Sequence, residues 1–126
     1  PPATTLVARD LAGEIQVEGA EPPWPGGSRR QLRVRLKNAS RAVWLAGERP
    51  GGVALEVRLH NAGHAARGPR PWLPLPVDLP PGGEHVFTLD LRRPPGAATL
   101  HLEPHVLGRS GFARLGGPVW QGELRP

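Results

Sequence analysis

Three titratable side chains alternate along one short run of the sequence. In "HLEPH" these are His101, Glu103 and His105, and alternate residues of a β-strand point to the same face. Imidazole and carboxylate groups are ligands for zinc and copper. Neighbouring members of the set lie about 6.6 Å apart along a strand, so all three meet at one ion only if the chain bends at Pro104. We expect a solvated outer face here, and the alternative is a metal site that His60 completes.

A catalytic constellation is harder to assemble. The chain has no cysteine, which excludes disulfides, thiolate metal sites and sulfur nucleophiles. Asp10, Asp78 and Asp90 are far apart in the sequence, and no serine stands in a G-x-S-x-G nucleophile elbow. The glycine pairs in "PGGS" and "PPGG" open no helix whose N-terminus would hold a phosphate. We therefore expect no enzymatic activity and no cofactor.

Basic residues form a second alternating set: Arg33, Arg35 and Lys37. We expect them on one outward face, with Arg58 beside them, and the formal net charge of +5 admits a polyanionic partner. Nucleic-acid-binding proteins usually place aromatic residues among their basic residues. This run has no aromatic residue, so we do not expect nucleic acid as a partner. Solvated cations, paired with Glu56 or Asp90, are the favoured interpretation, and a polyanion site is the alternative.

Four tryptophans divide into two pairs. Trp44 follows a predicted buried strand and Trp120 lies in the last predicted strand, so we expect both in the core. Trp24 in "PPWPGG" and Trp72 in "RPWLPLP" stand in proline-rich loops. The favoured interpretation is that each loop ring plugs one end of the fold. In the functional alternative, Trp24 and Trp72 are exposed ligand-binding rings that rigid loops hold at little entropic cost.

Alternation of apolar and polar residues predicts the strands that must position these side chains. The clearest runs are "QLRVRLKN", "VALEVRLHN", "HVFTLDL" and "ATLHLEPHVL", and weaker strands are expected at Leu6 to Ala8, "EIQVE" and "PVWQGEL". Glycine and proline clusters separate the runs, and no segment has a helical apolar stripe. The sequence thus predicts an all-β immunoglobulin-like antiparallel sandwich of about seven strands, with a jelly roll or small barrel as the alternative. Pro104 indicates an edge position or a bulge.

The length of 126 residues suits one domain, with residues 1–30 as N-terminal strands and a Pro/Gly loop and residues 31–126 as the core of the sandwich. No apolar run approaches the ~18 residues of a membrane span, and the first ten residues do not resemble a signal peptide. A start at Pro1 fits initiator removal, an excised domain or a mature secreted form. Lys37 is the one lysine, and glycine and proline number 17 each. This bias is typical of a GC-rich genome and favours a thermophile.

The order of motifs resembles a known type of module. The series runs "VRLKNAS", "AVW", "GGVALEVRLHNAG", "LPLPVDLPPGG", "FTLDLRRPPGAATLHL" and "SGF". It is similar to bacterial Ig-like accessory modules appended to glycosyltransferases and methyltransferases of surface-polysaccharide synthesis, and more distantly to the four-tryptophan domain of selective-autophagy receptors. The resemblance covers residues 32–115, and its most specific elements are Trp44 and "LPPGG". Ser110, Gly111 and Phe112 stand where the module has a late Trp-Phe pair.

This resemblance implies a non-catalytic binding or accessory domain that docks or targets within a cell-surface or envelope-glycan system. The implied partner is a glycan or another protein domain. The expected location is the cytoplasm for a domain fused to a transferase, and otherwise the cell surface or the medium. A structural spacer or decoration domain with protein contacts is the alternative, and a polyanion-binding or metal-binding domain is third. The sequence leaves the oligomeric state open.

Overall fold

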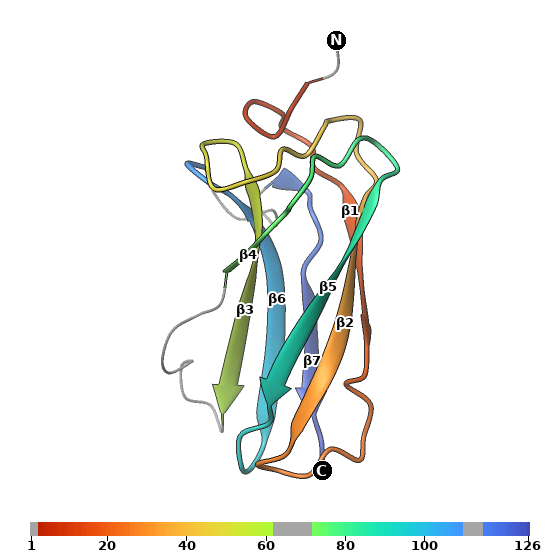
Figure 1. Ribbon diagram of the computed structural model, residues 1–126, viewed down its shortest axis with the longest axis vertical. Helices are drawn as coiled ribbons and strands as arrows, with labels where there is room; N and C mark the ends of the chain where they lie inside the picture. The colour runs from red at the N-terminus through yellow and green to blue at the C-terminus, as the bar shows by residue number, and fades with distance from the viewer. Residues whose placement is uncertain (1–2, 62–71, 110–114) are drawn as a thin grey trace.

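A computed structural model describes residues 3–61, 72–109 and 115–126. These residues form two antiparallel β-sheets packed as a sandwich (Figure 1), and they contain no α-helix. The all-β, immunoglobulin-like prediction is confirmed. The described part of the chain has no helix long and apolar enough to cross a membrane.

The two sheets share the strands in an immunoglobulin-like order. The three-stranded sheet has the order β1-β2-β5 and contains β1 (Gly13–Glu18), β2 (Arg29–Asn38) and β5 (Glu84–Arg92). The four-stranded sheet has the order β4-β3-β6-β7 and contains β3 (Val53–Asn61), β4 (Trp72–Pro74), β6 (Ala98–Val106) and β7 (Trp120–Leu124). β1, β2 and β5 take the places of strands A, B and E, and β3, β6 and β7 take those of C, F and G. The short β4 adds a C′-like edge beside β3.

Alternating burial explains why these runs become strands. In β2, Leu32, Val34 and Leu36 are fully buried between the sheets while the residues between them point outward. In β6 the buried residues alternate with partly exposed ones along the whole strand. Each fully buried aliphatic side chain stabilises the fold by roughly 1.5–3 kcal/mol relative to an exposed one. One cluster of buried residues runs from Ala8 to Leu124 and draws on both sheets.

The strand expected at Leu6 to Ala8 is wrong. Residues around Thr5 form a turn in which the Ala8 N–H donates to the Thr4 carbonyl at 2.9 Å. Thr4 makes only an isolated bridge to Val43. This segment is too short for a ladder, and the buried Thr5 hydroxyl bonds to the Gly51 carbonyl at 2.5 Å instead.

Pro104 lies in β6, an interior strand of its sheet, at a position where β6 pairs with β3 but no longer with β7. It lies in β6 opposite Leu55 of β3. The pairing of β6 with β7 extends from Ala98 to Leu102, so it ends before Pro104. The N–H group that proline lacks therefore removes no hydrogen bond to β7, and β6 stays in register with β3 past this residue.

One end of the sandwich is closed by a buried polar network built on Asn38. Its Nδ2 group donates to the carbonyls of Ala42 at 2.8 Å and Leu79 at 2.9 Å. Its Oδ1 atom accepts from the Ser40 N–H at 2.9 Å and the Ser40 hydroxyl at 2.7 Å. The Trp44 indole N–H donates to the Ser40 hydroxyl at 3.2 Å. Trp44 is fully buried, as predicted, and Asn38 of the "NAS" triplet is fully buried as well.

Candidate functional site

The outer face of the four-stranded sheet gathers one aromatic ring and several ionisable side chains. We call it the Trp72 surface, and it comprises Trp72, Glu56, Arg58, His101, Glu103 and His105. The strand register places Trp72 of β4 opposite Glu56 of β3, and Glu56 opposite Glu103 of β6. Arg58 stands opposite His101 in the next outward-facing pair. These side chains share one face because Leu55 and Val57, between them on β3, are buried in the core.

Trp72 does not plug an end of the sandwich. It lies on the edge strand β4 (Figure 1), and 44% of the residue is exposed. Its ring packs against the imidazole of His105, with the ring centroids 4.9 Å apart and the planes tilted by 57°. His105 of β6, which lies beyond β3 in the same sheet, therefore supports Trp72 while much of the indole stays open to solvent.

Charged groups beside the ring hold one another in place. The Arg58 Nε atom lies 2.9 Å from Oε1 of Glu56, and its Nη2 atom lies 4.0 Å from Oε1 of Glu103. The His105 Nε2 atom lies 3.5 Å from the same Glu56 oxygen. Glu56 is only 5% exposed although it points away from the core. The carboxylate is thus covered by its neighbours on the sheet, and the group of side chains is ordered before any ligand arrives.

His101 completes this network as a neutral base. Its Nδ1 atom lies 2.9 Å from Arg58 Nη2, and since a guanidinium only donates, the imidazole nitrogen accepts. Burial lowers the pKa of His101, and the Arg58 cation lowers it further, against weaker raising effects of Glu103 and Glu56. Both influences favour the uncharged imidazole that the hydrogen bond requires.

The metal alternative at His101, Glu103 and His105 is not supported. Within residues 3–61, 72–109 and 115–126, no group of three His, Cys, Asp or Glu side chains is placed to hold a metal ion. β6 remains a regular strand through Pro104, so the three side chains keep their separation. The Arg58 cation contacts both His101 and Glu103 and would repel a metal cation there. His60 lies opposite Thr99 and completes no ligand set.

The predicted basic stripe lies on the outer face of the other sheet. Its members stand along the central strand β2: Arg33, Arg35 and Lys37. On one side, Glu18 and Glu14 of β1 stand opposite Arg33 and Lys37. On the other side, Glu84 of β5 stands opposite Lys37, and its Oε2 atom lies 3.9 Å from Arg35 Nε. Carboxylates therefore flank the stripe, but they are not the expected ones, because Glu56 lies on β3 of the other sheet and Asp90 pairs with Arg29 at 3.2 Å.

Arg58 was expected beside this stripe, and that expectation is wrong. The residue belongs to β3 on the opposite outer face, where it pairs with Glu56. The two strands have similar alternation, and only their assignment to different sheets separates their charges.

Trp24 closes the end of the sandwich opposite Asn38. The residue is fully buried, and its indole N–H donates to the Ser28 carbonyl at 3.2 Å. The Arg30 guanidinium lies 5.0 Å from the centre of the ring. The plug interpretation is confirmed for Trp24, and a role as an exposed ligand-binding ring is wrong. Trp120 is partly buried and packs against the core without belonging to it, so the core prediction holds for this residue only in part.

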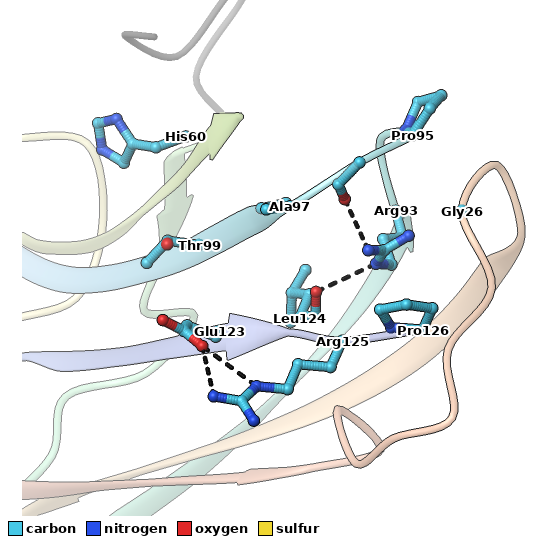
Figure 2. A pocket seen from close by; sticks show the side chains of 12 residues that line it. Gly26, His60, Arg93, Pro95, Ala97, Thr99, Glu123, Leu124, Arg125 and Pro126 are labelled. Atoms are coloured by element: carbon cyan, nitrogen blue, oxygen red, sulfur yellow. Dashed lines mark hydrogen bonds and ion pairs between the residues drawn. The ribbon is translucent and has the colours of Figure 1, made fainter. Parts of the chain in front are cut away.

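A pocket of about 740 Å³ lies at this same end of the molecule, and the sequence analysis did not anticipate it. It contains the buried Arg93 and is drawn in Figure 2. A signal for it is present in the sequence: Arg93, the residue directly after β5, continues the inward phase of Phe87, Leu89 and Leu91. An arginine at an inward position indicates a buried cation.

Comparison with known proteins assigns this chain to no family. No family model matches the chain, and no curated protein matches it. Among solved structures, the crystal structure of beta-glucosidase from Listeria innocua in complex with glucose is similar over 90% of this chain and 16% of that chain. The sequence identity is 17% and the TM-score is 0.46. The chain thus spans about a sixth of the length of that enzyme, and the likeness says nothing of an activity.

Proposed function

We propose that this domain is a non-catalytic binding module and that the Trp72 surface is its contact site for a glycan. The single observation that carries this is the half-open indole of Trp72, set on an outer sheet face beside ordered polar groups. A sugar ring has an apolar C–H face and a rim of hydroxyls. An exposed aromatic ring matches the former, and carboxylate, imidazole and guanidinium groups match the latter.

Preorganisation of the surface supports the same function. β4 pairs with β3 from Trp72 to Pro74, so the backbone that carries the indole is held in a ladder. Arg58 and Glu56 already contact each other at 2.9 Å. A ligand that docks here orders few side chains, and each rotamer-rich side chain that need not be immobilised saves roughly 0.5–1.5 kcal/mol of binding free energy.

The resemblance to modules of surface-polysaccharide transferases indicates what kind of glycan to test. We infer an accessory role, in which the domain docks a transferase or another envelope protein onto its polymer. The runner-up is a structural spacer that contacts only protein, because a tryptophan at the centre of a patch is also a common anchor in protein interfaces. A polyanion site on Arg33, Arg35 and Lys37 is less favoured, since carboxylates flank that stripe.

A glycan array followed by titration tests the proposal. The wild type should bind at least one envelope polysaccharide and change its tryptophan emission on binding. Trp72→Ala should weaken binding by at least about tenfold, which corresponds to ~1.4 kcal/mol. Affinity should change little between 0.05 and 0.5 M salt, because stacking is weakly screened.

The matched control is Val77→Ala. Val77 is also an exposed apolar residue, but it belongs to a loop outside the Trp72 surface, so its truncation should leave affinity unchanged. Circular dichroism of each variant verifies folding. A blank array, or Trp72→Ala binding as well as the wild type, contradicts the glycan function and leaves the spacer role. Binding that falls steeply with salt and disappears in Arg35→Gln would favour the polyanion site instead.

A further inference from the structure

The pocket at the Trp24 end of the sandwich is built from four parts of the chain that are distant in the sequence, near residues 26, 60, 93–99 and 123–126. The connection from β5 to β6 forms one wall, the end of β7 forms another, and outward residues of β3 and β6 reach its rim (Figure 2). The main lining residues are Gly26, His60, Arg93, Gly96, Thr99 and Glu123. The walls also include apolar groups from prolines and alanines of the same segments.

Arg93 is the charged group of this pocket, and it is only 2% exposed. Its Nε atom donates to the Leu124 carbonyl at 3.2 Å, and its Nη2 atom donates to the Gly96 carbonyl at 2.6 Å (Figure 2). In the described part of the chain, Nη1 donates to no acceptor and no carboxylate pairs with the guanidinium. Since an arginine stays protonated in proteins, a full positive charge is held here with two neutral carbonyls as its partners.

Two other arginines near the pocket are satisfied, in contrast to Arg93. Arg30 donates to three backbone carbonyls, of Gly19, Glu21 and Pro23, and lies over the Trp24 ring. Arg125 pairs with Glu123 through two contacts of 2.8 and 3.1 Å, which neutralise the carboxylate that lines the pocket. In the part of the chain described, Arg93 is thus a charged side chain of the pocket with no carboxylate partner. A buried charge without a counter-ion is costly, and an anion that enters the pocket removes that cost.

Gly26 leaves room beside Nη1, one of the two nitrogens of Arg93 that keep an uncommitted N–H. A Cβ atom at residue 26 would lie 2.9 Å from Arg93 Nη1 and 3.2 Å from the Pro95 Cα atom. The absence of a side chain therefore leaves room beside Nη1. The pocket rim adds neutral donors, because the Thr99 hydroxyl lines it and the backbone N–H groups of Gly96 and Ala97 bond to no acceptor among the residues described.

We propose that this pocket binds one oxyanion group, a carboxylate or a phosphate carried on a sugar-sized ligand, with Arg93 Nη1 as its cationic donor. Two of the five N–H groups of the guanidinium already donate to Leu124 and Gly96, so Nη1 and the second N–H of Nη2 remain for the ligand. A charge-assisted hydrogen bond of this kind is roughly twice as strong as a neutral one. The apolar walls receive the body of the ligand. Trp72 does not line the pocket, so the pocket and the Trp72 surface can each be confirmed or refuted without the other.

Nuclear magnetic resonance titration of the intact chain tests the pocket. The probes are glucuronate, glucose 6-phosphate and neutral glucose, which share a ring and differ in the anionic group. We expect saturable shifts for at least one of the two anions, centred on Gly26, Gly96 and Thr99, and none at these positions for glucose. The carboxylate arm and the phosphate arm identify which oxyanion the pocket prefers.

Two variants and one control sharpen the test. Gly26→Ala places a methyl group 2.9 Å from Nη1, so the guanidinium must shift out of its place in the pocket. Arg93→Lys keeps the charge but loses the guanidinium fork. Each should weaken anion binding by at least about tenfold, which corresponds to ~1.4 kcal/mol. Arg92→Gln is the matched control, because Arg92 is the adjacent arginine, is exposed on β5 and does not line the pocket.

The outcomes that overturn the inference are specific. The absence of saturable shifts for both anions removes the site, and so do shifts that cluster outside the pocket. An equal loss of affinity in Arg92→Gln would mean that general surface charge, and not the pocket, attracts the anion. If circular dichroism shows that Gly26→Ala or Arg93→Lys does not fold, the residues whose chemical shifts change in the wild type decide whether the anion binds in the pocket. Normal anion binding by Trp72→Ala alongside a failed glycan array would separate this site from the proposed function.

Discussion

Removal of the Asn38 side chain is the most direct test of how this sandwich is closed. Asn38→Ala deletes four hydrogen bonds at once: two from Nδ2 to the carbonyls of Ala42 and Leu79, and two from Ser40 to Oδ1. All four are buried. Water therefore cannot replace the lost partners without opening this end of the fold.

The expected loss of stability is worked from these bonds. A buried hydrogen bond contributes a net ~0.5–1.5 kcal/mol, so four bonds correspond to roughly 2–6 kcal/mol. Three of the abandoned groups keep a second partner. The Leu79 carbonyl accepts from the Trp44 backbone N–H at 2.9 Å, the Ser40 hydroxyl accepts from the Trp44 indole at 3.2 Å, and the Ala42 carbonyl lies 3.4 Å from the Ser40 hydroxyl. We therefore expect the free energy of unfolding to fall by about 3 kcal/mol.

Urea denaturation measured by circular dichroism tests this value. At a slope of about 1.5 kcal/mol/M, the midpoint should fall by about 2 M with the slope unchanged. Gln31→Ala is the control, because Gln31 lies on the same strand with its side chain exposed, and a surface change usually stays within ±0.5 kcal/mol. Asn38→Asp should be at least as harmful near pH 7, since it turns a carboxylate toward two carbonyls. A loss below about 1 kcal/mol in Asn38→Ala would refute the network as a source of stability.

Two further predictions concern the core and the charged outer face. Trp44→Ala should lower the free energy of unfolding by about 3–5 kcal/mol, because the ring is fully buried, and a loss under ~1 kcal/mol in urea denaturation would contradict that placement. Stability should fall as the pH drops below about 6.5, because burial and Arg58 hold the pKa of His101 below its ordinary 6.5 in the folded chain, with Glu103, His60 and Glu56 as its other charged neighbours. The unfolded chain then binds the proton first, so acidification favours unfolding. Thermal melts at pH 7.5 and 5.5 should show a smaller pH effect in His101→Gln than in the wild type, and an identical pH effect would exclude His101 as a source.

Local alternation made the strands predictable. The inward phase of Leu32, Val34 and Leu36 repeats every second residue, and burial in a two-layer fold requires that period. The same alternation predicts that Arg93 points inward. Only the tertiary structure shows that this cation lines a pocket. The strand prediction at Leu6 to Ala8 is wrong because three residues are too few for an alternation that excludes a turn.

The sequence by itself determined the fold class, the strands with strong alternation and the burial of Trp44. Local periodicity and turn residues encode these features, and each is readable within a window of a few residues. Only the tertiary structure decided that the Trp24 ring is buried, with Arg30 over it, and that the Trp72 ring is exposed on β4. Their proline-rich loops look alike in sequence. Partners that distinguish them come from far along the chain, as do those of Arg58 and His101, which are 43 residues apart. Strand pairing brings such groups together, and no local pattern records which strands will be neighbours.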